Sequence, residues 1–320
     1  MSRHPASASP AFTLIEMAIV LVIAGLLMVM VLGATTGLLG NQKRQNVRAR
    51  LDAIETAMTN FVAVNRRLPC PADGRLASSA PGAGVEALVP ATGACQAAVL
   101  AHGVVPWVTL GITESDAQDP WNARLTYRLD PALAGAAPLP LLMNMSNCDP
   151  ASSGATGAGG ICKLPAASCT GNANCTSPAA FLAGKGLDVW TCMNGANGWS
   201  ARPNNSTTGS GAAWVITSHG PGGNSAYNSA GILQPGTVPL SKDLEDKNAN
   251  GTLLTAKPPT QANAYCDAPL NENEALLVQT IPPPPAPAPP PRTQLHFDDY
   301  LSHPTLMSVL NRANLGPRPH

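Results

Sequence analysis

The sequence predicts an α+β fold, in which a long N-terminal helix packs on a small antiparallel sheet with disulfide-bearing loops. Three observations support this class: an uncharged apolar segment near the start, an amphipathic continuation after it, and several short alternating segments further along. We expect the first half of the helix to span a membrane, and the second half to lie against the sheet. In such folds the helix buries one stripe of side chains and the sheet one face.

The apolar segment covers residues 17–34, which contain no charged side chain. With residues 12–15 it reaches the roughly 20 residues that a helix needs to cross a hydrocarbon core. A secretory signal peptide fits less well, because its apolar region is shorter and residues 33–35 are a poor cleavage site. A plain membrane anchor leaves Glu16 unexplained, since a carboxylate in a spanning helix is costly and usually functional.

A helical period continues beyond the apolar segment. Apolar residues recur at spacings of four and three, separated by charged and polar residues, at Val47, Leu51, Ile54, Met58 and Phe61. The spacing predicts one apolar stripe on a helix that runs over residues 12–65 and ends before Pro69. A coiled coil is the alternative, but only about two heptads are present, so a sheet of the same chain is the more economical partner.

Four short segments predict the antiparallel sheet. They alternate apolar and polar residues or contain aromatic and β-branched residues, and they cover residues 125–129, 187–193, 213–217 and 275–281. Between the helix and the first of them lies a loop region rich in Ala, Gly and Pro, residues 70–103. The order of the strands and their register do not follow from the sequence.

The eight cysteines indicate an oxidising compartment. They lie in a chain rich in Gly and Pro with no Cys-x-x-Cys spacing, which favours disulfides over metal ligands. We predict the pairs Cys70 with Cys95 and Cys169 with Cys175, because short loops close easily. Residues 148–175 have too few apolar side chains to form a core, so crosslinks should order them.

The segment Ala11-Phe12-Thr13-Leu14-Ile15-Glu16 resembles the processing site of type IV prepilins and type II secretion pseudopilins. The resemblance implies that a prepilin peptidase cuts between Ala11 and Phe12 and methylates the new N-terminus of Phe12. The residue before the cut is usually Gly, so Ala11 implies slower cleavage. Glu16 would then pair with the Phe12 ammonium of a neighbouring subunit, which at 4 Å gains about 4 kcal/mol before desolvation is subtracted.

The resemblance extends beyond the helix, with less specific motifs. Residues 67–74 and 105–111 look like the helix exit and the following turn of some family members. Asp119-Pro120-Trp121-Asn122 is similar to the pseudopilin segment that opens the sheet, where Gly is commoner than Asn122. Beyond about residue 130 the resemblance is weak.

The resemblance implies a structural subunit and no enzyme: a minor pilin or pseudopilin of a type IV pilus or a type II secretion pseudopilus. A competence-type assembly is a third possibility. The implied partners are prepilin peptidase, other pilin or pseudopilin subunits and an inner-membrane assembly platform. The alternative is a membrane-anchored periplasmic enzyme or binding protein that is not incorporated into a filament.

We expect a single-pass protein of the bacterial inner membrane with its C-terminal domain in the periplasm. The cationic cluster at residues 43–50 points the other way, but the cysteines and the processing motif outweigh it. The expected parts, in order, are a leader (1–11), a transmembrane and filament-core helix (12–40), the periplasmic half of the helix (41–68), a globular pilin-like α+β domain (69–281), a polyproline linker (282–291) and a C-terminal element (292–320).

Charge and the remaining motifs exclude other classes of function. Nineteen basic and nineteen acidic residues give no net charge, so no nucleic-acid partner is predicted. Asp246, Asn248 and Asn250 match the first half of a calcium loop, but Lys257 replaces its closing Glu, so a plain turn is favoured over a calcium site. Ser218 and His219 follow the predicted strand 213–217, and adjacent residues of a strand point to opposite faces, which argues against a nucleophile and its base unless the backbone turns there.

Overall fold

The structure is a computed structural model, which describes residues 14–134, 143–146, 178–192, 199–223, 225–234, 248, 264–267 and 297–318. Within these residues it has mixed helix and sheet structure, with five α-helices and ten strands. The chain divides into two compact units, Met1–Asn46 and Val47–His320. Each unit is described by itself below.

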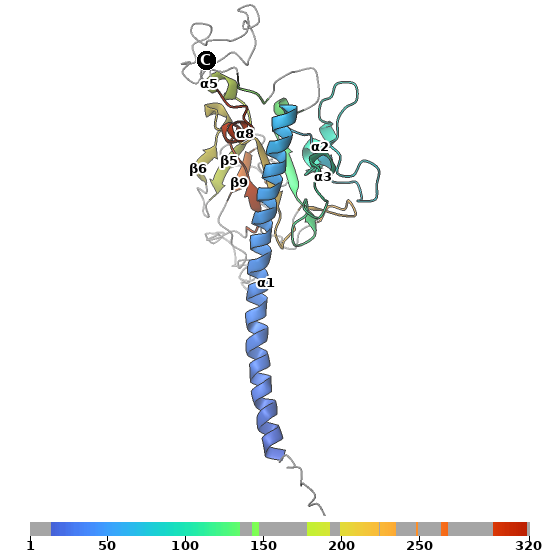
Figure 1. The fold of residues 1–320 in the computed structure, drawn as a ribbon, viewed down its shortest axis with the longest axis vertical. Helices are drawn as coiled ribbons and strands as arrows, with labels where there is room; N and C mark the ends of the chain where they lie inside the picture. Colours follow the sequence, from blue (N-terminus) through green and yellow to red (C-terminus); the bar gives the residue numbers. More distant parts are fainter. Residues whose placement is uncertain are drawn as a thin grey trace, which may run out of the picture. The chain divides into compact units, whose positions relative to one another are not determined.

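Helix α1 covers Leu14–Asn65 and contributes residues to both units (Figure 1). No helix in the described part of the chain combines the length and the apolarity that a membrane crossing requires. The predicted transmembrane helix at residues 12–40 and the predicted single-pass inner-membrane location are therefore wrong.

The second unit contains a five-stranded antiparallel sheet with the strand order β1-β2-β4-β7-β10. Its strands are β1 (Ala72–Asp73), β2 (Gly103–Val104), β4 (Thr126–Leu129), β7 (Trp214–Ser218) and β10 (Tyr300–Ser302). In the centre β4 pairs with β7, with Tyr127 opposite Ile216. Strand β10 comes from the C-terminal end of the chain and forms one edge of the sheet.

Two smaller sheets complete the described strands. Strands β3 (Ala123–Arg124) and β8 (Tyr227–Asn228) pair antiparallel. Strand β5 (Asp188–Cys192) lies between β6 (Trp199–Asn204), which is antiparallel, and β9 (Ala264–Asp267), which is parallel. The predicted strands 125–129, 187–193 and 213–217 correspond to β4, β5 and β7. However, β5 belongs to a separate, mixed sheet, and the predicted strand 275–281 lies outside the described residues.

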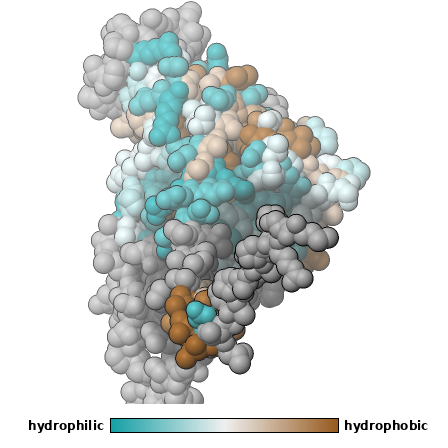
Figure 2. Space-filling model, turned by 60° about the horizontal axis from the view of Figure 1, so that its bottom comes forward, coloured by the Kyte–Doolittle hydropathy of each residue, from teal (hydrophilic) through white to brown (hydrophobic). Residues whose placement is uncertain are grey.

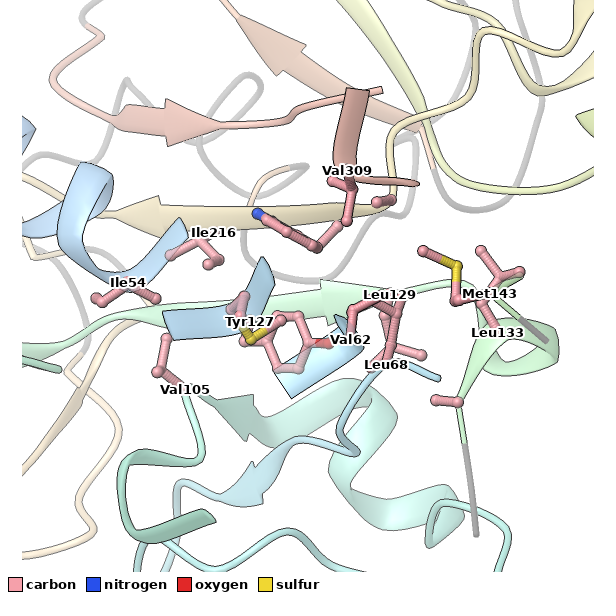
Figure 3. Close-up of a cluster of buried hydrophobic side chains, with 14 of the residues drawn as sticks. Ile54, Val62, Leu68, Val105, Tyr127, Leu129, Leu133, Met143, Ile216 and Val309 are labelled. Carbon is pink, nitrogen blue, oxygen red and sulfur yellow. The ribbon is translucent and has the colours of Figure 1, made fainter. Parts of the chain in front are cut away.

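The main core of the second unit forms where α1 packs on the five-stranded sheet (Figure 3). Ile54, Met58 and Val62 are fully buried on α1, and they belong to one cluster with Tyr127 and Ile216. The predicted stripe changes at its end, because Phe61 is half-buried and carries the Arg67 guanidinium 5.0 Å from its ring centre. The spacing of apolar residues therefore predicts the buried face of α1 correctly up to Met58. The next buried residue on that face is Val62 rather than Phe61.

Four shorter helices surround the sheets: α2 (Ala97–His102), α3 (Trp107–Leu110), α5 (Pro178–Leu182) and α8 (Leu306–Arg312). The loop region after α1 is fastened by the disulfide Cys70–Cys95, one of the two predicted pairs. Beside it, the Arg67 guanidinium donates two hydrogen bonds to the Glu86 carboxylate, which also accepts the Cys70 amide. Cys266 is disulfide-bonded as well, whereas the predicted pair Cys169 with Cys175 lies outside the described residues.

Candidate functional site

The first candidate site is the start of helix α1. Glu16 lies in the first turn with an exposed side chain, where the positive end of the helix dipole favours a carboxylate. Large apolar side chains on the turns around it are between 49% and 71% exposed: Ile15, Met17, Ile19, Val20, Leu21, Val22, Ile23, Leu26 and Met28. In Figure 2 the described start of α1 forms a brown cluster. Ala11 and Phe12 lie outside the described residues, so cleavage and methylation there stay predictions.

Five consecutive exposed apolar residues, 19–23, cover every side of a helix, since successive residues are about 100° apart. A helix that is apolar on all sides is normally buried. Exposed apolar surface of this extent indicates a site of interaction with another molecule. Glu16 provides one negative charge at the end of this surface, so the arrangement is suited to packing against apolar helices that offer a cation near its first turn.

The second candidate site is a buried polar cluster at the end of strand β7. The Ser218 hydroxyl donates a hydrogen bond of 2.8 Å to Asp119 Oδ2, and Asp119 Oδ1 accepts the backbone amides of Trp121 and Ala123. Asp119 therefore closes a tight turn in which Asn122 has a φ of 65°. Such a left-handed conformation suits Gly best and Asn next, which explains why Asn is accommodated at position 122.

His219, the residue after the end of β7, contacts a different set of partners from Ser218. Its Nε2 lies 2.9 Å from Thr126 Oγ1, and its Nδ1 lies 3.3 Å from Asp299 Oδ1. Hydroxyl, imidazole and carboxylate stand in the order of a nucleophile triad. However, Thr126, His219 and Asp299 are at most 2% exposed, so a substrate cannot reach the hydroxyl. We conclude that this cluster holds the fold together.

Asn248, one of the predicted calcium ligands, is fully buried beside this cluster. Its amide oxygen accepts the Cys266 amide, while its amide nitrogen donates to Cys266 O and to Asp299 Oδ2. The oxygen that would bind a cation is therefore used by the backbone of β9. Asp246 and Asn250 lie outside the described residues, and within those that are described no group of three or more His, Cys, Asp or Glu side chains is arranged to hold a metal.

Sequence reasoning missed the partners of His219. Thr126 and Asp299 lie 93 and 80 positions away from it in the chain, and no local spacing connects them. Comparison with known proteins finds no match for this chain among family models, curated proteins or solved structures. The functional assignment therefore depends on the residues of the chain itself.

Asp119 makes stability depend on pH in a direction that can be tested. Burial raises the pKa of its carboxyl above the usual 3.8, although the hydrogen bonds from Ala123, Ser218 and Trp121 work against this shift. A group with a raised folded pKa stabilises the fold below its unfolded pKa and loses that contribution as pH rises through the folded pKa. We expect Asp119→Asn, which lacks this titration, to gain stability relative to the wild type as pH rises from about 4 to 7.

The measurement is the urea midpoint of both proteins in a series of buffers. Asp116→Asn is the matched control. Hydrogen bonds from Thr113 lower the pKa of the exposed Asp116, so its contribution to stability rises with pH, whereas that of Asp119 falls. The Asp116 variant should lose stability relative to the wild type as pH rises to about 4, and should change little relative to it between about 4 and 7. Parallel curves for Asp119→Asn and the wild type would contradict the prediction.

Proposed function

We propose that this chain is a structural subunit of the pilin-like class, which is trimmed between Ala11 and Phe12 and assembles into a filament through the start of α1. The filament would be a type IV pilus or a type II secretion pseudopilus. The single observation that carries the proposal is the apolar surface at residues 15–28 of α1, with Glu16 in its first turn. Its partners in assembly would be copies of this chain or related subunits.

Lateral packing of helices accounts for this surface. Side chains that are apolar on all sides of a helix lose contact with water when several such helices bundle, at a gain of about 25 cal/mol for each Å² buried. Nine large apolar side chains are exposed on consecutive turns of α1, and the folding of a single copy does not account for this exposure. Bundling of α1 between subunits would bury them.

Glu16 would select the register of that bundle. Trimming after Ala11 creates an ammonium group on Phe12, four residues before Glu16 in the same chain. In a staggered bundle the ammonium of one subunit can approach the carboxylate of the next, and a pair 4 Å apart gains about 4 kcal/mol before desolvation is subtracted. A stagger that buries the carboxylate without a cation is penalised, so one register is preferred.

The globular part would be carried along by the same helix. Residues 47–62 of α1 are held in the core of the second unit, with Ile54, Met58 and Val62 fully buried. Each copy that joins the bundle through the start of α1 would therefore bring one folded second unit into the assembly.

The test compares Glu16→Gln with the wild type in cells that also express a prepilin peptidase and a filament assembly system. Intact mass should show that both proteins have lost residues 1–11 and gained one methyl group. We expect the variant to be processed but to appear in the sheared filament fraction at about a tenth of the wild-type amount or less. A loss of about 1.4 kcal/mol of binding free energy at each contact between subunits lowers the association constant tenfold.

Asp52→Asn is the matched control, since it removes an exposed carboxylate from another part of the same helix. It should assemble as the wild type does. A chain that still begins at Met1 in these cells, or a Glu16→Gln chain that enters filaments at the wild-type level, would refute the proposal.

A further inference from the structure

The described part of the C-terminal element, residues 297–318, belongs to the second unit and packs there through β10 and α8. Its strand β10 adds to the edge of β7 with Tyr300 opposite Ser218 and Leu301 opposite Thr217. Addition of a strand to an open sheet edge is a common way in which proteins bind extended peptides. Without β10, the edge of β7 would be free to pair with any other strand.

Two acidic residues fix the position of the element. Asp298 Oδ2 accepts the backbone amide of Gly222 at 2.6 Å, while Asp299 contacts His219 and Asn248. The turn after β7 fits closely around this pair, because a Cβ atom built on Gly220 would come within 2.3 Å of the Asp298 carbonyl oxygen. The turn after β7 therefore contacts both the carboxylates and the backbone of the segment Asp298–Asp299.

Helix α8 completes the docking. It buries Leu306, Val309 and Leu310, which belong to the main core of the second unit. Arg312 at its end pairs with Glu55 of α1, and the Ser302 hydroxyl donates to the same carboxylate. The element thus contacts α1, the helix that assembles the subunits in the proposed function.

The chain between β9 and this element is long. Asp267 ends β9 and Phe297 begins the element, so residues 268–296 provide 29 intervening positions, ten of them the run PPPPAPAPPP. A segment of this length can span up to roughly 95 Å, which exceeds the roughly 50 Å width of a compact domain of this size. The element can therefore reach the docking site of another copy as well as its own.

We propose that the C-terminal element is exchanged between copies of this chain, so that β10 and α8 of one subunit dock on β7 and α1 of the next. The exchanged interface contains the same contacts as the closed one, which makes exchange a low-cost route to association. Copies held side by side would offer neighbouring elements at an effective concentration comparable to that of the tethered one. Exchange that passes from each copy to the next, rather than reciprocally between two copies, is open-ended, so it would link subunits along a fibre.

The experiment traps the exchanged strand between two distinguishable full-length chains. One chain carries Thr217→Cys and the other Leu301→Cys, with different affinity tags, and both are expressed in the same oxidising compartment. Directly opposite residues of antiparallel strands have Cα atoms about 4.5–5.5 Å apart, within the range of a disulfide. We expect a disulfide-linked pair of the two chains, with the link located by mass spectrometry of the joined peptides.

Ile232→Cys replaces Thr217→Cys in the control pair, because Ile232 is 61% exposed and lies outside β7. The amount of disulfide-linked product from the test pair should exceed that from the control pair about tenfold or more, as expected for a specific tethered contact. A single chain with both Thr217→Cys and Leu301→Cys provides a second readout: exchange gives a ladder of linked multimers, and docking within one chain gives only monomers. Monomers alone, or a test pair at the control level, would overturn the proposal.

These variants leave residues 1–16 unchanged. The exchange rests on the proposed assembly, which holds the copies side by side, so exchange can fail while processing and assembly still succeed. The two proposals are tested separately.

Discussion

Replacement of Arg124 by Met is expected to lower the free energy of unfolding by about 3 kcal/mol, because it removes the cation from a buried network. Arg124 is 1% exposed, and its guanidinium donates to the Glu114 carboxylate at 2.8 and 3.0 Å. It also donates to the carbonyl oxygens of Leu76 and Ser229. The guanidinium lies 4.9 Å from the ring centre of Trp107 as well. Methionine fills a similar space but donates no hydrogen bond: Glu114 Oε1 and Ser229 O keep donors from Ser78, whereas the Leu76 carbonyl oxygen loses the bond from Arg124 and Glu114 loses its buried cation.

The measurement is urea unfolding of the full-length chain, followed by tryptophan fluorescence. Arg124→Lys should be intermediate, since an ammonium keeps the charge but has three donors and no planar fork. Arg75→Met is the matched control: Arg75 pairs with Asp73 at 2.7 Å, but its side chain is 46% exposed, so its loss should cost less than about 1 kcal/mol. Equal unfolding midpoints for Arg124→Met and Arg75→Met would show that the buried network contributes no more than a surface pair.

The sequence predicts those parts of the fold that depend on local periodicity. Val47, Leu51, Ile54 and Met58 are all buried in the structure, because residues three and four apart share one face of a helix. Alternation likewise locates strand β4, and aromatic and β-branched residues locate β7. The prediction of one antiparallel sheet was wrong for β5, since a short apolar run does not specify which neighbour it pairs with or in which direction.

The membrane prediction was wrong for a related reason. A count of apolar residues measures only the length of a run in the sequence. No helix among the described residues, α1 with its exposed residues 15–26 included, combines the length and the apolarity of a membrane span. The same residues support the proposed packing between subunits, which depends on apolar surface rather than on the length of a span.

Contacts between distant parts of the chain could not be predicted. The turn closed by Asp119 is local, but it was not predicted, and the segment 119–122 was identified only as one that resembles the opening of a sheet. In contrast, the partners of His219 lie on β4 and in the C-terminal element, and hydrogen bonds between them depend on the register of β7 with both neighbours. A shift of one residue would turn every side chain of a strand to the other face, so such a cluster follows from the assembled sheet alone.

Replacement of Ile54 by Ala is expected to lower the free energy of unfolding by about 3 kcal/mol, the usual cost of a large-to-small change in a core. Ile54 is fully buried on α1, in the cluster that includes Val105 and Ile216 (Figure 3). The change removes three carbon atoms and leaves a cavity between the helix and the sheet. Ile54→Val removes one methyl group and should cost about 1 kcal/mol.

Val64→Ala is the matched control on the same helix, because Val64 is 80% exposed. It should change stability by less than about 0.5 kcal/mol, as surface substitutions usually do. Urea unfolding of the three variants then measures how firmly residues 47–62 of α1 are held in the second unit. If Ile54→Ala unfolded at the same urea concentration as Val64→Ala, the helix would be too loosely attached to carry the globular part into an assembly, and the proposed role of α1 would lose its physical basis.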